Sequence, residues 1–326
     1  MSANPEVQYT SISISPLFED SRLPLLVTPA GNPSLKHCLH DIQLLVSKEL
    51  YLSGGLLLRG FETDTEMDFT HFCQSFGYDL LSYDYASTPR SQVNKGVYTS
   101  TEYPAHQSIP LHNEQAYTTS WPLKIWFNCV TASTEGGETP IADSRRVYQE
   151  LDPAIRDKFI GHGLLYVRNY GNGLDLPWQK AFSTDSKAEV ENFCQSNGID
   201  YVWKEDGELQ TRQICQAVAQ HPVTQDMVWF NQAHLFHVSN LDPAIRETLL
   251  SIVGEQDLPR NVYYGNGEAI ADHELDHIRE VLDRCQVSFL WQEGDIMMLD
   301  NMLSAHGRSP FKGERKVIVA MAEPHS

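Results

Sequence analysis

The sequence predicts a mainly β protein in which a sandwich or barrel carries helical insertions. Many short segments have strand character, and they do not alternate with helices in the strict order that a doubly wound sheet requires. The chain has 326 residues, whereas single hydrophobic cores usually stop growing at about 250 to 300 residues. We therefore expect one decorated domain over residues 1–326.

The predicted elements begin after a segment rich in Ser and Pro, residues 1–35, which we expect to wrap the surface. Leu-Asp-Pro-Ala-Ile-Arg occurs at 151–156 and again at 241–246, and each copy offers an N-capping Asp followed by Pro at the first helical position. The flanking residues do not match, so this is a repeated helix start and not a repeat protein. Helices are predicted at 35–49, 64–75, 143–159, 187–197, 242–254 and 271–284, and strands at 55–59, 124–131, 164–170, 227–230, 286–290, 295–299 and 316–320.

The composition argues against several classes of function. The chain has 24 Lys and Arg against 43 Asp and Glu, a formal charge of −19, which opposes binding to nucleic acid or to an anionic membrane. Apolar stretches such as 55–58 are too short to span a bilayer, and the first residues lack the features of a signal peptide. Six cysteines occur without a Cys-x-x-Cys pair, which predicts reduced thiols in a cytoplasmic protein.

Among the 13 histidines, His112 and His306 are the candidates for chemistry. In His112-Asn113-Glu114, residues i and i+2 of an extended segment face the same way, so His112 and Glu114 could share a metal. His306 follows an apolar strand and is the best third ligand. Two imidazoles and one carboxylate form the facial triad of non-haem Fe(II) oxygenases. Taken alone, His-x-Glu could also be a chance pattern on a strand.

The surrounding motifs resemble those of the taurine and chlorophenoxyacetate dioxygenases, enzymes that use Fe(II), 2-oxoglutarate and O2. The resemblance rests on Gly136-Gly137-Glu138-Thr139 after the His-x-Glu pair and on Arg315 after His306-Gly307-Arg308, and it covers about 55–321. It implies that His112, Glu114 and His306 hold the iron and that Thr139 and Arg315 hold 2-oxoglutarate. It also implies a double-stranded β-helix, a cupin-like jelly roll, with an insertion or lid region at about 145–285.

Within this family the sequence looks closest to the syringomycin-type amino-acid hydroxylases. The taurine enzymes carry Asp where Glu114 stands, and their sulfonate-binding arginine would fall near Val319, so taurine is not the expected substrate. Halogenating relatives have lost the carboxylate. Since Glu114 is present, the resemblance implies oxygenation with release of succinate and CO2.

The resemblance leads us to expect hydroxylation of an amino acid in secondary metabolism, for example in antibiotic biosynthesis. The amino acid could be free or tethered to a carrier protein, although the charge of −19 would repel an acidic carrier. Desaturation or cyclisation of another small molecule, and a non-catalytic cupin-like binding protein, are the alternatives. The sequence leaves a homo-oligomer open.

Three residues are candidates for substrate contact: Asn113, Arg168 and Arg308. Arg308 lies two residues beyond His306 and would point the same way on a continuing strand. Arg168 and Tyr170 precede Gly171-Asn172-Gly173, whose glycines could allow a lid to close. A structural ion pair is the other interpretation of Arg308.

Other histidines are interpreted as structural. His273-Glu274-Leu275-Asp276-His277 matches the zinc-protease pattern, but the apolar stripe of the predicted helix runs through Leu275, Ile278, Leu282 and Cys285 and leaves His273 and His277 on the solvated face. His234 and His237 lie among aromatics, where a ring N–H bonded to a carbonyl is more plausible than metal binding. The histidines without a partner signal, which we expect in loops or on the surface, are His162, His221 and His325.

Overall fold

The structure is a computed structural model that describes residues 8–82, 85, 90–171 and 173–326. The part of the predicted surface-wrapping segment at residues 1–7 lies outside this range, and so does Asn172 of the predicted lid.

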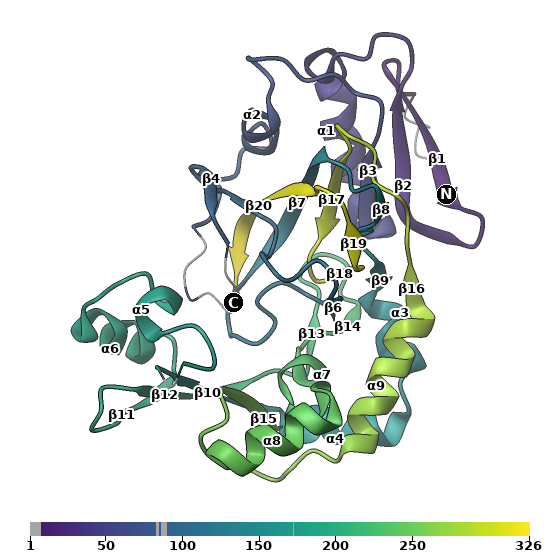
Figure 1. Cartoon of the computed structure of the whole chain (residues 1–326). Coiled ribbons are helices and arrows are strands. Elements are labelled where there is room, and N and C mark those ends of the chain that lie inside the picture. The colour runs from purple at the N-terminus through teal and green to yellow at the C-terminus, as the bar shows by residue number, and fades with distance from the viewer. Residues whose placement is uncertain (1–7, 83–84, 86–89, 172) are drawn as a thin grey trace.

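Two β-sheets form the centre of the molecule (Figure 1). The larger has the order β1-β2-β3-β17-β7-β20-β5-β4, and the smaller has the order β16-β9-β18-β6. The larger sheet comprises β1 (Ile12–Phe18), β2 (Ser21–Pro29), β3 (Gly55–Leu58), β17 (Ile296–Asp300), β7 (Trp121–Thr131), β20 (Lys316–His325), β5 (Val97–Thr99) and β4 (Gln92–Asn94). The smaller comprises β16 (Gln286–Val287), β9 (Ile141–Asp143), β18 (Ser304–Arg308) and β6 (Ile109–His112), and a separate pair joins β8 (Glu135–Gly136) to β19 (Phe311–Lys312). The predicted jelly roll with flanking helices is confirmed.

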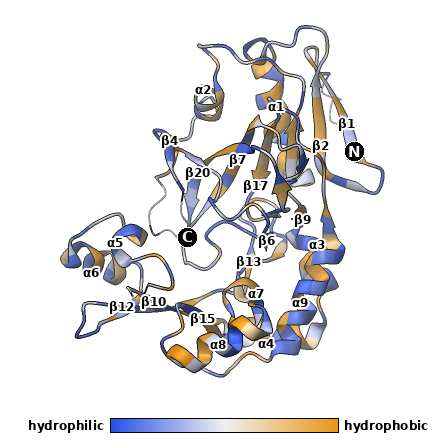
Figure 2. Ribbon diagram, in the orientation of Figure 1, coloured by the Kyte–Doolittle hydropathy of each residue, from blue (hydrophilic) through white to orange (hydrophobic). Residues whose placement is uncertain are grey.

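The centre of the larger sheet is buried on both faces, as β17 shows. Met297 and Leu299 belong to the hydrophobic cluster that includes Ile141 of the smaller sheet. Ile296 and Met298 belong to the cluster on the other face, because alternate side chains of a strand point to opposite sides. Figure 2 shows the apolar character of β7 and β17. Each such side chain, once buried, stabilises the fold by about 1.5 to 3 kcal/mol.

Two helices pack against the outer face of the larger sheet. The first, α1 (Leu35–Ser53), begins where the Ser34 side chain accepts a hydrogen bond from the His37 N–H and ends at Gly54, whose φ of 80° suits glycine. The second, α2 (Phe69–Gln74), is capped by Asp68. Leu35, Ile42 and Phe72 of these helices lie in the same hydrophobic cluster as Met298.

The chain between β9 and β16 folds as an additional layer on the jelly roll (Figure 1). Its core is continuous with the jelly roll through residues such as Leu111 and Ala305. Its strands are β10 (Leu164–Tyr170), β11 (Asp200–Trp203), β12 (Leu209–Cys215), β13 (Val218–Gln220), β14 (Met227–Trp229) and β15 (Arg260–Tyr264). Its helices are α3 (Ser144–Glu150), α4 (Pro153–His162), α5 (Trp178–Ala181), α6 (Lys187–Ser196), α7 (Ala233–Phe236), the 3-10 helix η1 (Val238–Asn240), α8 (Pro243–Val253) and α9 (Asp272–Cys285).

Two of the differences from the sequence prediction have a clear physical reason. The helix predicted at 143–159 is two helices, because Asp152 caps α4 and Pro153, which has no N–H, begins it. The predicted surface-wrapping segment contains β1 and β2, which pair at the edge of the larger sheet. Leu23, Leu25 and Val27 are buried there, so apolar burial outweighs the Ser and Pro content of the segment.

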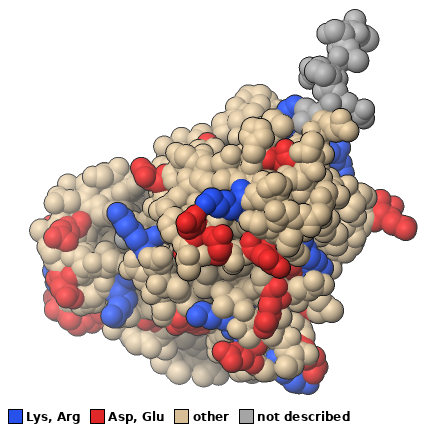
Figure 3. Space-filling view, turned by 90° about the horizontal axis from the view of Figure 1, so that it is seen from above, with Lys and Arg blue, Asp and Glu red and all other residues tan. Residues whose placement is uncertain are grey.

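The charged side chains on the surface and the apolar character of the helices are relevant to possible binding partners. On the face seen in Figure 3, basic side chains are interspersed with acidic ones. Within the described part of the chain, none of the helices combines the length and the apolar character needed to cross a membrane.

Candidate active site

His112, Glu114 and His306 meet at one end of the smaller sheet. His112 is the last residue of β6 and pairs in register with His306 of β18. Glu114 lies in the turn after β6, so the pair is not on one extended strand as the sequence predicted. One potential ligand atom from each of the three side chains lies within 4.8 Å of the others. His306 Nε2 is 3.9 Å from Glu114 Oε2.

The protonation of the two imidazoles suits a divalent metal. His112 donates its Nδ1–H to the Pro110 carbonyl over 2.9 Å, which leaves Nε2 with a free lone pair. Burial lowers the pKa of His112, and it lowers the pKa of His306 well below the usual value, aided by His112 and Arg90. Both rings are therefore neutral near pH 7, the state in which imidazole binds metals.

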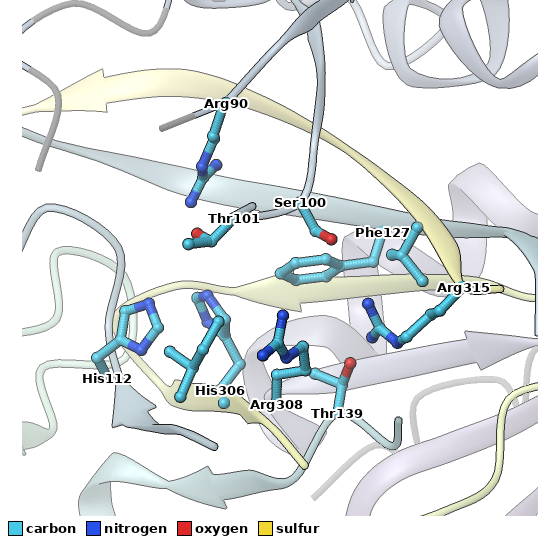
Figure 4. A pocket seen from close by; sticks show the side chains of 12 residues that line it. Arg90, Ser100, Thr101, His112, Phe127, Thr139, His306, Arg308 and Arg315 are labelled. Carbon is cyan, nitrogen blue, oxygen red and sulfur yellow. The ribbon is translucent and has the colours of Figure 1, made fainter. Parts of the chain in front are cut away.

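Arg90 is a residue of the site that sequence reasoning missed. Its Nη2 donates to Glu114 Oε2 over 2.7 Å, and both side chains are only 4% exposed. Arg90 also lines the cavity beside the two histidines (Figure 4). It is 24 residues from Glu114 and belongs to no motif, so nothing in the sequence pointed to the pair.

A small cavity beside His306 is lined by Thr139 and Arg315 (Figure 4). Trp291 donates its indole N–H to the Thr139 hydroxyl oxygen over 3.0 Å, so the Thr139 O–H remains able to donate to another group. Arg315 donates Nε–H to the Gly137 carbonyl over 2.8 Å. Burial, reinforced by Arg308, lowers the pKa of Arg315 to about 10. The positive charges of Arg308 and Arg315 beside one cavity indicate that it favours an anion.

The loop beside the small cavity requires glycine at position 137 because of its backbone conformation and its close neighbours. Its φ is +76°, and a Cβ there would lie 2.4 Å from Ser133 Oγ and 3.0 Å from Arg315 Cδ. A larger residue would thus displace Arg315. The residues around the small cavity come from two stretches of chain, 90–139 and 306–317, and its described lining contains three arginines and no carboxylate.

A larger cavity of about 480 Å³ opens on the other side of His112. It shares Arg90 and His112 with the small cavity and also contains Glu114. Its remaining walls come from 101–110 and from the additional layer, between Gln232 and Arg260. Small-molecule sites usually measure about 300 to 1,000 Å³, so this cavity can hold a substrate next to the three-residue cluster.

Of the three residues predicted to contact substrate, the structure places only Arg308 at one of the two cavities. Asn113 donates to Ser144 Oγ and to the Asn301 carbonyl, away from both cavities. Arg308 borders the small cavity, but its guanidinium donates to the carbonyls of Tyr103, Pro104 and Gln107. These bonds give it a role in fixing the 103–107 loop.

Arg168 lies in the core of the additional layer. It is 2% exposed, and its guanidinium carbon lies 4.7 to 5.9 Å from the ring centres of Tyr85, Tyr117 and Tyr170. It is not among the residues described as lining either cavity. Packing against aromatic rings, and not substrate contact, is the role this geometry supports.

The histidines of the zinc-protease pattern do not form a site with each other. Leu275, Ile278, Leu282 and Cys285 are buried as predicted, and His273 is exposed. His277 accepts a hydrogen bond from the Asp152 N–H, and Glu274 is bound to Lys158. Of the described residues, only the cluster at His112 brings three potential metal ligands together.

His234 is structural, as the sequence analysis favoured, whereas His221 was misjudged. His234 is 2% exposed and donates Nε2–H to the Leu111 carbonyl over 2.8 Å. His221 is fully buried, not in a surface loop. Its Nδ1 accepts from the N–H groups of Val223 and Thr224, and its Nε2–H faces Asp300 Oδ2 at 3.2 Å. Asp300 is 79 residues from His221 in the chain, and no sequence motif indicates that the two side chains pair.

The buried His234 predicts an acid-sensitive stability. Burial lowers the pKa of His234 to about 4. Between pH 6.5 and 4 the His234 imidazole therefore becomes protonated in the unfolded chain but stays neutral in the folded protein. The metal-free protein is expected to lose roughly 3 kcal/mol over this interval because of His234. His234→Gln should reduce the loss, measured by urea unfolding at pH 7.0 and 4.5. An equal reduction in His273→Gln, where the ring is exposed, would contradict the assignment.

Comparison with known proteins gives several matches. The family model described as "Taurine catabolism dioxygenase TauD, TfdA family" matches residues 26–321. The dapdiamide synthesis protein DdaC of Enterobacter agglomerans is 43% identical over 285 residues, covering 87% of this chain and 85% of that protein. A clavaminate synthase-like protein of Arabidopsis thaliana is 30% identical over 321 residues, covering 95% and 92% of the two chains.

Solved structures show the same fold at low sequence identity. PvcB of Pseudomonas aeruginosa aligns with a TM-score of 0.56 and 16% identity over 99% of this chain and 95% of that one. AAD-2, solved with Mn(II) and N-oxalylglycine, aligns with a TM-score of 0.52 and 13% identity over 97% and 99%.

Proposed function

The chain belongs to the TauD/TfdA family of Fe(II)- and 2-oxoglutarate-dependent dioxygenases, and from this premise we propose that it hydroxylates an amino acid or a related small molecule in secondary metabolism. The observation that carries the proposal is the position of His112, which lines both cavities beside Glu114 and His306. One cavity suits an anionic cosubstrate, and the other leaves room for a substrate.

The residues present fit the iron and its cosubstrate. His112, Glu114 and His306 would hold Fe(II), since two neutral imidazoles and one carboxylate are its usual facial ligands. Thr139 and Arg315 would bind the far carboxylate of 2-oxoglutarate, Arg315 through a charge-assisted fork and Thr139 through its free O–H. Fe(II), 2-oxoglutarate and O2 together supply the oxidation, with release of succinate and CO2.

The protein's own contribution is position and exclusion of water. Phe127 packs with its ring centre 5.0 Å from that of His306 and lines the small cavity. Arg308 holds the 103–107 loop, and Tyr103 and Gln107 of that loop also line the larger cavity. The substrate would therefore lie between this loop and the additional layer, next to the iron ligands.

The larger cavity supports a substrate with an acidic group, such as a free amino acid. Arg90, which pairs with Glu114, also lines this cavity, so its positive charge would favour a substrate that carries an anionic group. Val319, near which the resemblance places the sulfonate-binding arginine of the taurine enzymes, is fully buried in the hydrophobic core. Taurine is therefore not the substrate that we propose.

A free substrate fits the surface better than one tethered to an acidic carrier protein. Beside Leu241, at the edge of the larger cavity, a neighbouring hollow is lined by Glu247, Asp272, Asp276 and a single arginine. The arginine of this hollow, Arg246, is already paired with Asp272, so the hollow offers no basic patch to an acidic carrier. We therefore favour the free amino acid within the syringomycin-type branch, and the names of two relatives, a dapdiamide synthesis protein and an oxygenase of an isonitrile pathway, support a role in secondary metabolism.

The proposed reaction predicts substrate-dependent formation of succinate. The Fe(II)-loaded protein with 2-oxoglutarate and O2 is expected to release succinate in proportion to product when given the right member of a panel of free amino acids, their amides and carrier-loaded forms. Mass spectrometry separates hydroxylation, a gain of one oxygen, from desaturation or cyclisation, a loss of two hydrogens. Coupled turnover with none of the amino-acid compounds would sink the assignment to an amino-acid hydroxylase.

A further inference from the structure

The side chain of Asn301 forms hydrogen bonds with both the backbone N–H and the backbone carbonyl of Glu114. Asn301 Oδ1 accepts from the Glu114 N–H over 2.7 Å, and Asn301 Nδ2 donates to the Glu114 carbonyl over 2.9 Å. The same Nδ2 donates to the Pro122 carbonyl over 2.9 Å. Asn301 is fully buried, so these bonds face no competition from solvent.

Asn301 links the two parts of the chain that supply the predicted metal ligands. It lies in the turn between β17 and β18, and β18 carries His306. Glu114 follows β6 nearly 190 residues earlier in the chain. A single side chain thus fixes the distance between the turn before His306 and the backbone that carries the carboxylate.

The turn that carries Asn301 is itself held in place. Asp300 Oδ1 accepts from the N–H groups of Met302 and Leu303, each over 3.1 Å. Asp300 Oδ2 accepts from Lys124 Nζ over 3.0 Å and faces His221 Nε2 at 3.2 Å. The side chains of Asp300, Lys124 and His221 are at most 2% exposed. The turn that carries Asn301 is therefore held rigidly.

We propose that Asn301 is a positioning residue that holds Glu114 at the correct place relative to His306 and thereby sets the metal affinity of the site. A metal site gains affinity when its ligands are held in place before the ion arrives, and the partners that orient ligands typically contribute 10- to 100-fold. This inference rests on the metal site of the proposed function. It assigns a cause to the position of the Glu114 backbone, which adds to the pairing of the Glu114 carboxylate with Arg90.

The test compares Asn301→Ala with Asn169→Ala. Asn169 is a matched control because it is 1% exposed, donates to the carbonyls of Gln256 and Leu258 and accepts from Gln210 Nε2. It lies on β10, in the sheet of the additional layer. Each variant therefore loses three hydrogen bonds of a buried asparagine, but only Asn301 contacts Glu114.

Metal affinity and stability are measured separately on the full chain. The metal-free proteins are titrated with Mn(II) at low temperature, with free Mn(II) followed by electron paramagnetic resonance, and their thermal unfolding is recorded without metal. Both variants should unfold at lower temperature than the wild type. The Kd for Mn(II) should rise about 10- to 100-fold in Asn301→Ala and stay at the wild-type value in Asn169→Ala. The d–d absorption of bound Co(II) should also change only in Asn301→Ala.

The outcomes separate this inference from the proposed function. Wild-type affinity for Mn(II) in Asn301→Ala, or an equal loss in Asn169→Ala, would overturn the positioning role and leave the metal site intact. A wild-type protein that binds no Mn(II) would overturn the metal site and the inference with it. If Asn301→Ala does not fold, Asn301→Ser, which keeps a polar group and leaves space for water, is judged by the same rise in Kd.

Discussion

Replacing His306 by alanine is expected to remove the metal site and all coupled turnover. His306 faces Glu114 at 3.9 Å and pairs with His112 across two strands, so its loss leaves two ligands from one short segment. Since even partners that only orient a ligand contribute 10- to 100-fold, the loss of a ligand should weaken Fe(II) binding by at least about 100-fold. Anaerobic addition of Fe(II) and then 2-oxoglutarate should give a weak visible charge-transfer band in the wild type and none in His306→Ala.

The control for this experiment is His273→Ala. His273 is exposed on α9 and belongs to the zinc-protease pattern. The charge-transfer band and succinate formation should both survive its replacement. A band that persists in His306→Ala would show that the proposed ligand set is incorrect. A band that is lost in His273→Ala would indicate that the zinc-protease pattern takes part in metal binding.

Replacing Arg315 by glutamine is expected to weaken 2-oxoglutarate binding without affecting the metal. Arg315 is the basic residue opposite Thr139 in the small cavity, and its Nε is already bound to the Gly137 carbonyl. Hydrogen bonds to charged groups contribute about 1.5 to 3 kcal/mol each, and 1.4 kcal/mol corresponds to a factor of ten. The Kd for 2-oxoglutarate should therefore rise roughly 100-fold, measured by anaerobic titration of the charge-transfer band.

Arg315→Lys tests the geometry of this contact separately from its charge. Lysine keeps the charge but loses the planar fork, so its Kd for 2-oxoglutarate should fall between those of the wild type and Arg315→Gln. The Kd for Mn(II) in the absence of 2-oxoglutarate should be the same in all three proteins. If 2-oxoglutarate bound Arg315→Gln as tightly as the wild type, another basic residue, such as Arg308, would have to hold the cosubstrate.

The sequence was informative wherever chemistry or local geometry dictates residue type. Asp152 with Pro153, and Asp242 with Pro243, predicted two helix starts that the structure contains. The resemblance to the dioxygenase family implied that His112, Glu114, Thr139, His306 and Arg315 belong to one site, and the structure brings the first two and His306 together. Short motifs succeed here because a metal ligand or a helix cap needs a particular side chain at a fixed spacing.

The partners that the sequence did not reveal are held by tertiary contacts. Burial alone would lower the pKa of Lys124, but Asp300 raises it above its usual value, and these two residues are 176 positions apart. Lys124 lies on a strand that was predicted correctly, yet no periodicity shows that its charged side chain points inward. Arg90 and Asn301 were missed for the same reason, since their contacts with Glu114 depend on how the sheets are folded together.

The two cavities are lined largely by different stretches of the chain. The residues proposed to bind the cosubstrate are therefore largely separate in sequence from those that would bind the substrate. Every described residue around the small cavity comes from 90–139 or 306–317, whereas the far walls of the larger cavity come from 232–260. Mutations between Leu235 and Arg260 can reshape those far walls without replacing a residue proposed to hold iron or 2-oxoglutarate, whereas Gln232 also donates to the Asn113 carbonyl between two of the proposed iron ligands. Replacement of the contiguous segment between β9 and β16 by that of a relative is therefore expected to change the substrate only where the contacts of Ser144, Gln232 and His234 with residues 111–113 are kept.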